Sequence, residues 1–141
     1  MKSLYIIVAL SLSFICNAQI PENESPEAAI KDYFDGYTRG DTVLLKHVFH
    51  PTFHLSWISP WTKGKNAFQQ VDREEMFSFF GPNWQRNKIN CSILETKIHD
   101  KMALVKARVE IEGVVVWIDY INLLQIDGRW WIVSKTSVGE I

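Results

Sequence analysis

The stretch that decides the fold runs from Asp119 to Lys135 and reads DYINLLQIDGRWWIVSK. Its centre is Asp127-Gly128, a dipeptide typical of the short turns that join antiparallel strands. Before the turn, the run from Val114 to Ile126 is long and apolar on both faces, interrupted by Asp119 and Asn122. After the turn, Trp130–Val133 is apolar again, and Trp130–Lys135 is expected to be the last strand. The stretch therefore predicts a β-hairpin.

The same period of two extends upstream of this hairpin. Apolar residues alternate with Lys, Arg and Glu from Ala103 to Ile111, and alternate again from Ile89 to Ile93. The breaks fall at His99-Asp100-Lys101 and at Glu112-Gly113, which are short enough for turns between antiparallel neighbours. We expect an antiparallel meander over this half of the chain.

The first half of the chain has the period of helices instead. Ser25 and Pro26 form a cap and a first turn, Gly40 ends that helix, and Asp41 caps a second one, which Pro51 terminates. Each helix has one apolar face. The faces comprise Ile30, Tyr33, Phe34 and Tyr37 in the first helix and Leu44, Leu45, Val48 and Phe49 in the second.

A strand and a third helix are expected between these helices and the meander. Alternation over residues 53–58 predicts a short strand, and Ser59–Gln70 is expected to form a loop or a short hairpin. Asp72 and Glu75 are spaced as a capping box, and Gly81-Pro82 ends the helix after an apolar flank that reaches Phe80. Helices segregated on one face of an antiparallel sheet give an α+β fold.

Residues 1–18 have the features of a secretory signal peptide. Lys2 precedes an apolar run, Leu4–Ile15, which is too short for a transmembrane helix of about 20 residues. Cys16-Asn17-Ala18 places small residues at the positions that a signal peptidase recognises. We expect cleavage before Gln19 and a secreted or periplasmic location.

The rest of the chain is predicted to be a short tether, residues 19–24, and one domain, residues 25–141. Two alternatives remain for the N-terminus. Lipid attachment at Cys16 is disfavoured by the bulky Ile15, and a buried N-terminal helix is disfavoured by Pro21 and the polar stretch after it.

Composition narrows the class of partner. The net charge is −1 and no Lys/Arg-rich run occurs, whereas a nucleic-acid binder usually carries a basic face. No later segment could span a membrane, so no membrane contact is expected after signal cleavage. Cleavage leaves Cys91 as the only cysteine, so we expect no internal disulfide and a small buried thiol at this position.

Three stretches resemble the NTF2-like superfamily. They are AAIKDYFDGYTRGD (Ala28–Asp41), VFHPTFHL (Val48–Leu55) and the hairpin DYINLLQIDGRWWIVSK (Asp119–Lys135). The resemblance covers about residues 26–138 and is greatest to the group labelled "putative lumazine-binding", near the SnoaL-like and DUF4440 groups. It implies a cystatin-like cone, in which a curved antiparallel sheet wraps three helices and encloses a pocket.

The resemblance implies a fold without fixing the chemistry. The superfamily includes isomerases, dehydratases, transport factors and binding modules, and a shared fold does not determine function. A lipocalin, the rival class of small exported binder, would need about eight strands before its helix, which three early helices do not allow.

Asp119 is the sharpest catalytic candidate in the implied pocket. It lies in the most apolar strand, where a carboxylate would be partly desolvated and could act as a general base. The alternative interpretation, which we favour, is that Asp119 pairs with a cross-strand Lys or Arg or faces solvent.

The histidines are weaker candidates. His50 and His54 are four residues apart, but Pro51 breaks the helix between them, so the spacing predicts no metal site. His50 is expected to be structural. His54 has the opposite parity to Phe53 and Leu55, so we expect it to face the pocket and name it as a second possible base, although an exposed or satisfied histidine is commoner.

Aromatic side chains supply the ligand-binding candidates, because aromatic rings around a cleft suit flat ligands. The candidates are Tyr33, Tyr37, Trp57, Trp61, Trp84, Trp117 and Tyr120, with Asn122 as a further polar group. Core packing or dimer contact is the alternative role for the tryptophans. Adjacent Trp130 and Trp131 must face opposite ways in a strand, so one of them lies on the outer face of the sheet. With Val133 on the same side as Trp131, this outer face is apolar enough to pair with another subunit, and we expect a homodimer.

The sequence therefore favours an exported domain that binds a small, partly apolar or aromatic ligand, with no catalysis evident and no cofactor expected. Two alternatives remain open: a small isomerase, lyase or hydrolase that uses Asp119 or His54 as base, and an oligomeric interaction module.

Overall fold

The computed structural model describes residues 23–141, which form three helices packed against one curved six-stranded sheet. The helices are α1 (Pro26–Arg39), α2 (Thr42–Val48) and α3 (Arg73–Phe77). The strands are β1 (Phe49–Ile58), β2 (Phe68–Asp72), β3 (Ile89–His99), β4 (Met102–Ile111), β5 (Val115–Ile126) and β6 (Arg129–Glu140). Two short 3₁₀ helices, η1 (Gly64–Ala67) and η2 (Trp84–Arg86), lie in the connections. The predicted signal peptide and its cleavage site lie outside the described residues.

The sheet is mixed. Its strand order is β2-β1-β6-β5-β4-β3, and neighbours run antiparallel except β1 and β6, which are parallel. The predicted antiparallel meander from β3 to β6 is confirmed, and the curved sheet is mostly antiparallel, as expected; the parallel β1–β6 pair is the one feature of its topology that was not predicted. The parallel pair forms because β1 joins the sheet beside the last strand, and the long intervening chain lets both run in one direction. Of the two options for Ser59–Gln70, the hairpin is the one observed, with β2 pairing to β1.

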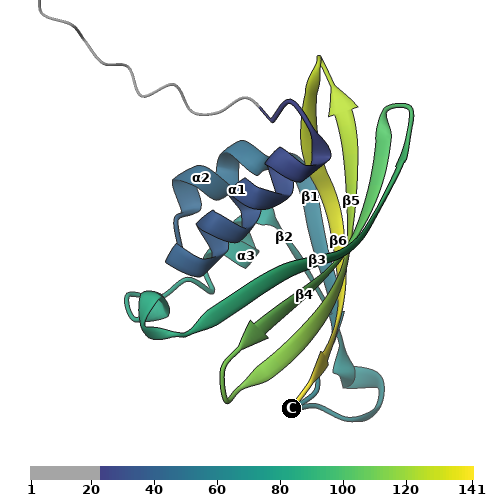
Figure 1. The fold of residues 1–141 in the computed structure, drawn as a ribbon. Helices are drawn as coiled ribbons and strands as arrows, with labels where there is room; N and C mark the ends of the chain where they lie inside the picture. Colours follow the sequence, from purple (N-terminus) through teal and green to yellow (C-terminus); the bar gives the residue numbers. More distant parts are fainter. Residues whose placement is uncertain (1–22) are drawn as a thin grey trace, which may run out of the picture.

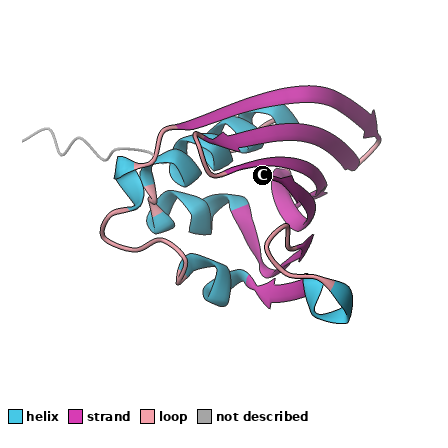
Figure 2. Ribbon diagram, turned by 90° about the horizontal axis from the view of Figure 1, so that it is seen from below, coloured by secondary structure: helices cyan, strands magenta, loops and turns pink. Residues whose placement is uncertain are grey.

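The helices lie on the concave side of this sheet. Figure 1 shows α1, α2 and α3 on one side of the strands, and Figure 2 shows the strands curving around them. None of the helices in the described part of the chain is long and apolar enough to cross a membrane.

The predicted start and end of α1 and the predicted start of α2 are confirmed by their caps, whereas α2 ends at Val48, and Phe49, expected on the face of that helix, begins β1 instead. The Ser25 hydroxyl accepts a hydrogen bond from the Ala28 backbone N–H at 3.1 Å. Gly40 ends α1 at a φ of 64°, a left-handed conformation that glycine adopts at low cost. The Asp41 carboxylate then accepts from the Leu44 N–H at 3.0 Å and starts α2.

The third helix starts as predicted and ends early. The Asp72 carboxylate accepts from the Glu75 N–H at 2.9 Å, which confirms the predicted N-cap. The helix stops at Phe77 rather than near Phe80, because the Ser78 hydroxyl donates to the Glu75 carbonyl at 2.6 Å and competes with the helical ladder. After Phe77 the chain tightens into i→i−3 hydrogen bonds, in which the Phe79 and Phe80 N–H groups donate to the Met76 and Phe77 carbonyls. Phe80 then packs against Tyr37 of α1.

The core fills the space between the helices and the sheet. Tyr33 from α1 packs against Phe49 with ring centroids 5.4 Å apart, and Phe49 stacks on Phe53 at 4.3 Å. Of the two adjacent tryptophans, Trp130 lies inside and Trp131 lies on the outer face. The fully buried aliphatic residues of the sheet include Ile121, Leu123, Val105, Val109 and Ile132.

A β-bulge in β6 changes which residues point inward. Ile132 pairs with Leu123, but Ser134 pairs with Asn122, so Val133 is an extra residue between them. Trp130 and Ile132 are therefore buried before the bulge, and Lys135 and Ser137 are buried after it. Without the bulge, strict alternation would turn Lys135 to the outer face.

Candidate functional site

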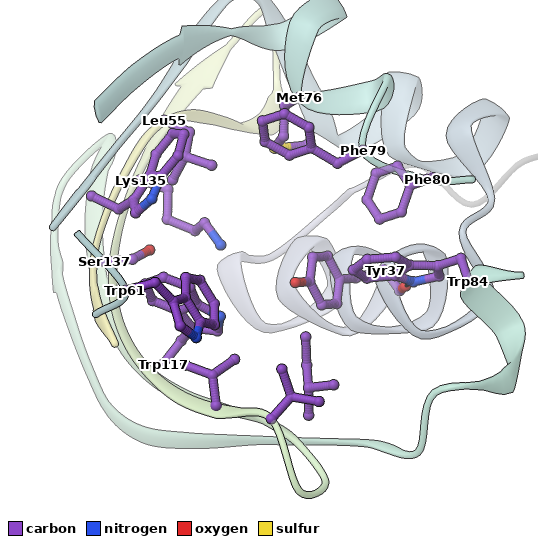
Figure 3. A pocket seen from close by; sticks show the side chains of 14 residues that line it. Tyr37, Leu55, Trp61, Met76, Phe79, Phe80, Trp84, Trp117, Lys135 and Ser137 are labelled. Carbon is purple, nitrogen blue, oxygen red and sulfur yellow. Dashed lines mark hydrogen bonds between the residues drawn. The ribbon is translucent and has the colours of Figure 1, made fainter. Parts of the chain in front are cut away.

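A cavity of about 300 Å³ lies between the concave face of the sheet and the helices. Its volume is at the lower end of the range of about 300–1,000 Å³ that is usual for small-molecule sites. Seven of its lining residues are aromatic: Tyr37, Trp57, Trp61, Phe79, Phe80, Trp84 and Trp117. We call this space the aromatic cavity (Figure 3).

One wall of the cavity comes from α1 and the segment after α3. Tyr37, Phe80 and Trp84 pack edge to face, with centroids 5.6 Å (Tyr37–Phe80), 5.2 Å (Tyr37–Trp84) and 4.8 Å (Phe80–Trp84) apart. The Trp84 indole N–H donates to the Tyr37 backbone carbonyl at 2.6 Å, which ties this segment to the end of α1. The wall is therefore held by both packing and a hydrogen bond.

The opposite wall comes from the sheet and the β1–β2 connection. Trp117 on β5 meets Trp61 edge to face at 5.9 Å, and Trp57 on β1 meets Phe79 at 6.1 Å. Trp61 is 58% exposed, so it lies at the edge of the cavity rather than within the core. Flat ring surfaces thus face the cavity from two sides, which suits a flat ligand.

The floor of the cavity is a buried polar cluster of four residues from α1, β5 and β6. Asp119 is fully buried, and its carboxylate accepts from Ser137 Oγ at 2.6 Å, Lys135 Nζ at 2.9 Å and Tyr33 Oη at 3.3 Å. Lys135 Nζ also donates to Tyr33 Oη at 2.9 Å. We call these residues, Tyr33, Asp119, Lys135 and Ser137, the polar floor. A buried ion pair of this kind needs such extra hydrogen bonds to offset its desolvation.

Both tyrosines near the floor are held in the neutral form. Burial is the main reason that the pKa of Tyr33 lies well above its usual value, and the Asp119 charge adds to the effect. Burial and then the Asp119 charge also raise the pKa of Tyr37. Each phenol therefore keeps its proton at physiological pH and can donate a hydrogen bond.

Two hydrogen-bond donors on opposite sides of the cavity each have a proton that is free to bind a ligand. Figure 3 shows the hydroxyl of Tyr37 and the ammonium of Lys135 pointing into the cavity. Within residues 23–141, the Tyr37 hydroxyl has no hydrogen-bond partner, and Lys135 Nζ donates to only two acceptors. An ammonium carries three N–H groups, so one remains for a ligand.

Five of the residues proposed from sequence for ligand contact line the aromatic cavity. They are Tyr37, Trp57, Trp61, Trp84 and Trp117. Their contact with a ligand stays a prediction. Tyr33 lies beneath the cavity instead, in the polar floor, and Asp119 is paired with Lys135 on the neighbouring strand. The interpretation of Asp119 as a cross-strand ion pair is the one observed.

His54 and Tyr120 are in the wrong place for the roles proposed. Leu55 and Trp57 line the cavity, so His54, of opposite parity in β1, is exposed on the outer face. Tyr120 neighbours the inward Asp119 in β5 and therefore also points outward, where its ring lies 5.6 Å from Lys106 Nζ. The expectation that His54 faces the pocket is wrong.

The other polar candidates lie away from the cavity. The Asn122 amide donates to Ser134 Oγ at 3.0 Å on the outer face. His50 Nδ1 is 2.8 Å from Thr52 Oγ1, and the His50 ring meets Trp131 edge to face. Among the described residues, no group of three His, Cys, Asp or Glu side chains is placed to hold a metal ion.

Cys91 is half-buried in β3, more open than the buried position expected for it. Burial is the main cause that raises the pKa of its thiol to about 11. The group is therefore a thiol rather than a reactive thiolate at neutral pH.

The sequence reasoning missed Lys135, Ser137 and Phe80 as site residues. The first two point inward only because of the bulge at Val133, for which the sequence carries no turn or glycine signal. Phe80 was expected within a helix and instead follows the early end of α3.

Comparison with known proteins identifies the family of the chain. The family described as "Putative lumazine-binding" matches residues 21–137, which is most of the chain. The chain belongs to this family. No curated protein matches the chain.

Solved structures share the fold of this family member at low sequence identity. An NTF2-like protein of unknown function from Silicibacter pomeroyi is 17% identical, with a TM-score of 0.66 over 81% of this chain and 92% of that one. A second, from Methylobacillus flagellatus, is 18% identical, with a TM-score of 0.66 over 82% of this chain and 89% of that one. A de novo designed protein with a curved β-sheet has 14% identity and a TM-score of 0.58 over 80% of this chain and 98% of that one. The chain therefore has the NTF2-like fold.

Proposed function

We propose that this protein is an exported binding module that takes a small, flat, largely apolar ligand into the aromatic cavity. One observation carries the proposal, the composition of the cavity lining. Seven of the fourteen lining residues are aromatic, and two of the others, Lys135 and Ser137, belong to the polar floor. Apolar walls with a few convergent polar groups are the usual composition of a ligand site.

Binding is favoured over catalysis by the groups that reach the ligand space. The residues that line the cavity in the described part of the chain include no Asp, Glu, His or Cys. Asp119, the base considered from sequence, lies behind Lys135 and Ser137 and already accepts three hydrogen bonds. A general base must reach the proton that it removes, directly or through one water.

The description of the family supports a flat ligand. Lumazine is a fused two-ring compound with carbonyl groups, and its shape suits the space between the Tyr37–Trp84 wall and Trp117. Export is proposed from the sequence of residues 1–18, and it would place this binding function outside the cytoplasm.

The proposal is tested by thermal unfolding and tryptophan fluorescence of the purified protein with lumazine and a panel of neutral two-ring aromatic compounds. A ligand at a hundred times its Kd should stabilise the fold by about 2.7 kcal/mol, which raises the Tm by several degrees. Stacking against Trp84 or Trp117 should also quench fluorescence.

Trp117→Leu and Trp131→Leu are a matched pair for this test. Both tryptophans are half-buried on the sheet, but Trp117 lines the cavity and Trp131 lies on the outer face under Arg129. Binding should weaken in the first variant and persist in the second. Equal loss in both variants, or no stabilisation by any compound of the panel, would contradict the proposal.

A further inference from the structure

We infer that the polar floor and Tyr37 select a neutral carbonyl group at one end of the ligand and reject a carboxylate. This inference rests on the proposed binding function and specifies the chemical class of its ligand. The juxtaposition behind it is a phenol donor from α1 facing an ammonium donor from β6 across the aromatic cavity (Figure 3).

The spare hydrogen-bonding groups of Tyr37 and of the polar floor define what the ligand must offer. Tyr37 Oη carries a proton and has no partner within residues 23–141, and Lys135 Nζ has one N–H left after its bonds to Asp119 and Tyr33. Two donors that converge from opposite walls need one acceptor with two lone pairs, and a carbonyl oxygen is such an acceptor. A ligand without an acceptor would bury both donors unpaired.

The charge of the floor argues against an anionic acceptor. Lys135 is the one cation that lines the cavity in the described part of the chain, and Asp119 already neutralises it at 2.9 Å. A ligand carboxylate would bring a second negative charge into an apolar space next to the fully buried Asp119. Desolvation of that charge would have no further cation to offset it.

Ser137 adds to this preference. Its hydroxyl proton is given to Asp119 Oδ1 at 2.6 Å, so the group presents only lone pairs to the cavity. These lone pairs would repel the second oxygen of a carboxylate. They would accept the N–H of a lactam, in which a donor lies beside the carbonyl.

The test uses three compounds with the same ring and similar size: acetylnaphthalene, naphthoate and isopropylnaphthalene. Their affinities for the purified protein are measured at neutral pH by calorimetry. Acetylnaphthalene should bind at least tenfold more tightly than either of the others, since the net value of about one hydrogen bond corresponds to a factor of ten. Equal affinity for all three, or tighter binding of naphthoate, would overturn the inference and leave the proposed function standing. If none of the three binds but lumazine or another compound of the two-ring panel does, the inference fails and the proposed function stands; if no compound of either set binds, both fail.

Tyr37→Phe separates a ligand contact from a structural role. The variant keeps the ring and its contacts with Phe80 and Trp84 and removes only the hydroxyl. It should lose about tenfold in affinity for acetylnaphthalene and none for isopropylnaphthalene. Tyr120→Phe, on the outer face, is the control and should change neither value. An equal effect of Tyr37→Phe on both compounds would overturn the assignment of Tyr37 as a carbonyl donor.

Discussion

The buried ion pair of the polar floor gives the sharpest prediction about stability. In Lys135→Met the ammonium is removed, and the fully buried Asp119 carboxylate keeps only the neutral donors Ser137 and Tyr33. Breaking a buried pair from one side costs about 3–5 kcal/mol, because it leaves an uncompensated buried charge. Since domains of this size have a total stability of about 5–15 kcal/mol, the variant should be close to the limit of folding.

A second substitution should restore most of this loss. In the double variant Asp119→Asn/Lys135→Met, the floor is neutral, and the new amide can accept from Ser137 and donate to Tyr33. Replacing a whole buried pair is often neutral, so the double variant should lie within about 2 kcal/mol of the wild type. The two substitutions would then be coupled by at least about 2 kcal/mol.

Urea unfolding followed by circular dichroism at constant m measures all four corners of this cycle. Lys97→Met is the control, because Lys97 is 69% exposed and forms only a surface pair with Glu95, so its effect should stay within about 1 kcal/mol. A Lys135→Met variant as stable as the wild type, or a double variant whose loss is the sum of the single losses, would refute the reasoning.

Three further predictions concern pH, packing and assembly. Because folding raises the pKa of Tyr33 and Tyr37, these tyrosines lose their protons in the unfolded chain first, above about pH 10. The free energy of unfolding should therefore fall above that pH by about 1.4 kcal/mol per pH unit for each tyrosine. Urea unfolding of Tyr37→Phe should show a smaller slope. In Gly139→Ala the new Cβ would lie 2.7 Å from Trp117 Cζ3, so we expect a loss of about 1–3 kcal/mol and a changed tryptophan emission spectrum, and an unchanged spectrum would contradict the packing described. The homodimer expected from the outer face stays a prediction; sedimentation velocity should show a dimer that Val138→Glu dissociates, whereas a monomer at all concentrations would exclude it.

The fold could be predicted because its signals are local. The Asp127-Gly128 turn, the Ser25 and Asp72 caps and the left-handed Gly40 each act within a few residues, and the structure contains all of them. The parallel pairing of β1 with β6 was not predictable in this way, because the two strands are distant in sequence. Alternation within a strand does not indicate which strand it pairs with.

The aromatic walls of the site were predictable, and the polar floor was only partly so. Trp57 and Trp117 were named because aromatic rings suit a cleft, and the apolar surroundings of Asp119 drew attention to it. Its partner Lys135 was not predicted, because one extra residue in β6 reverses the parity of every residue after it. The error for His54 has a different origin. The pocket was expected on the side of β1 that His54 faces, but Leu55 and Trp57, on the opposite side, line the cavity.

The most direct test of the central claim is a crystal structure of the purified protein soaked with the tightest-binding neutral aromatic compound. The account predicts that the ring lies in the aromatic cavity between Trp84 and Trp117, with its carbonyl oxygen within about 3.2 Å of both Tyr37 Oη and Lys135 Nζ. A compound bound outside the cavity, or a cavity closed by its own side chains, would contradict the account.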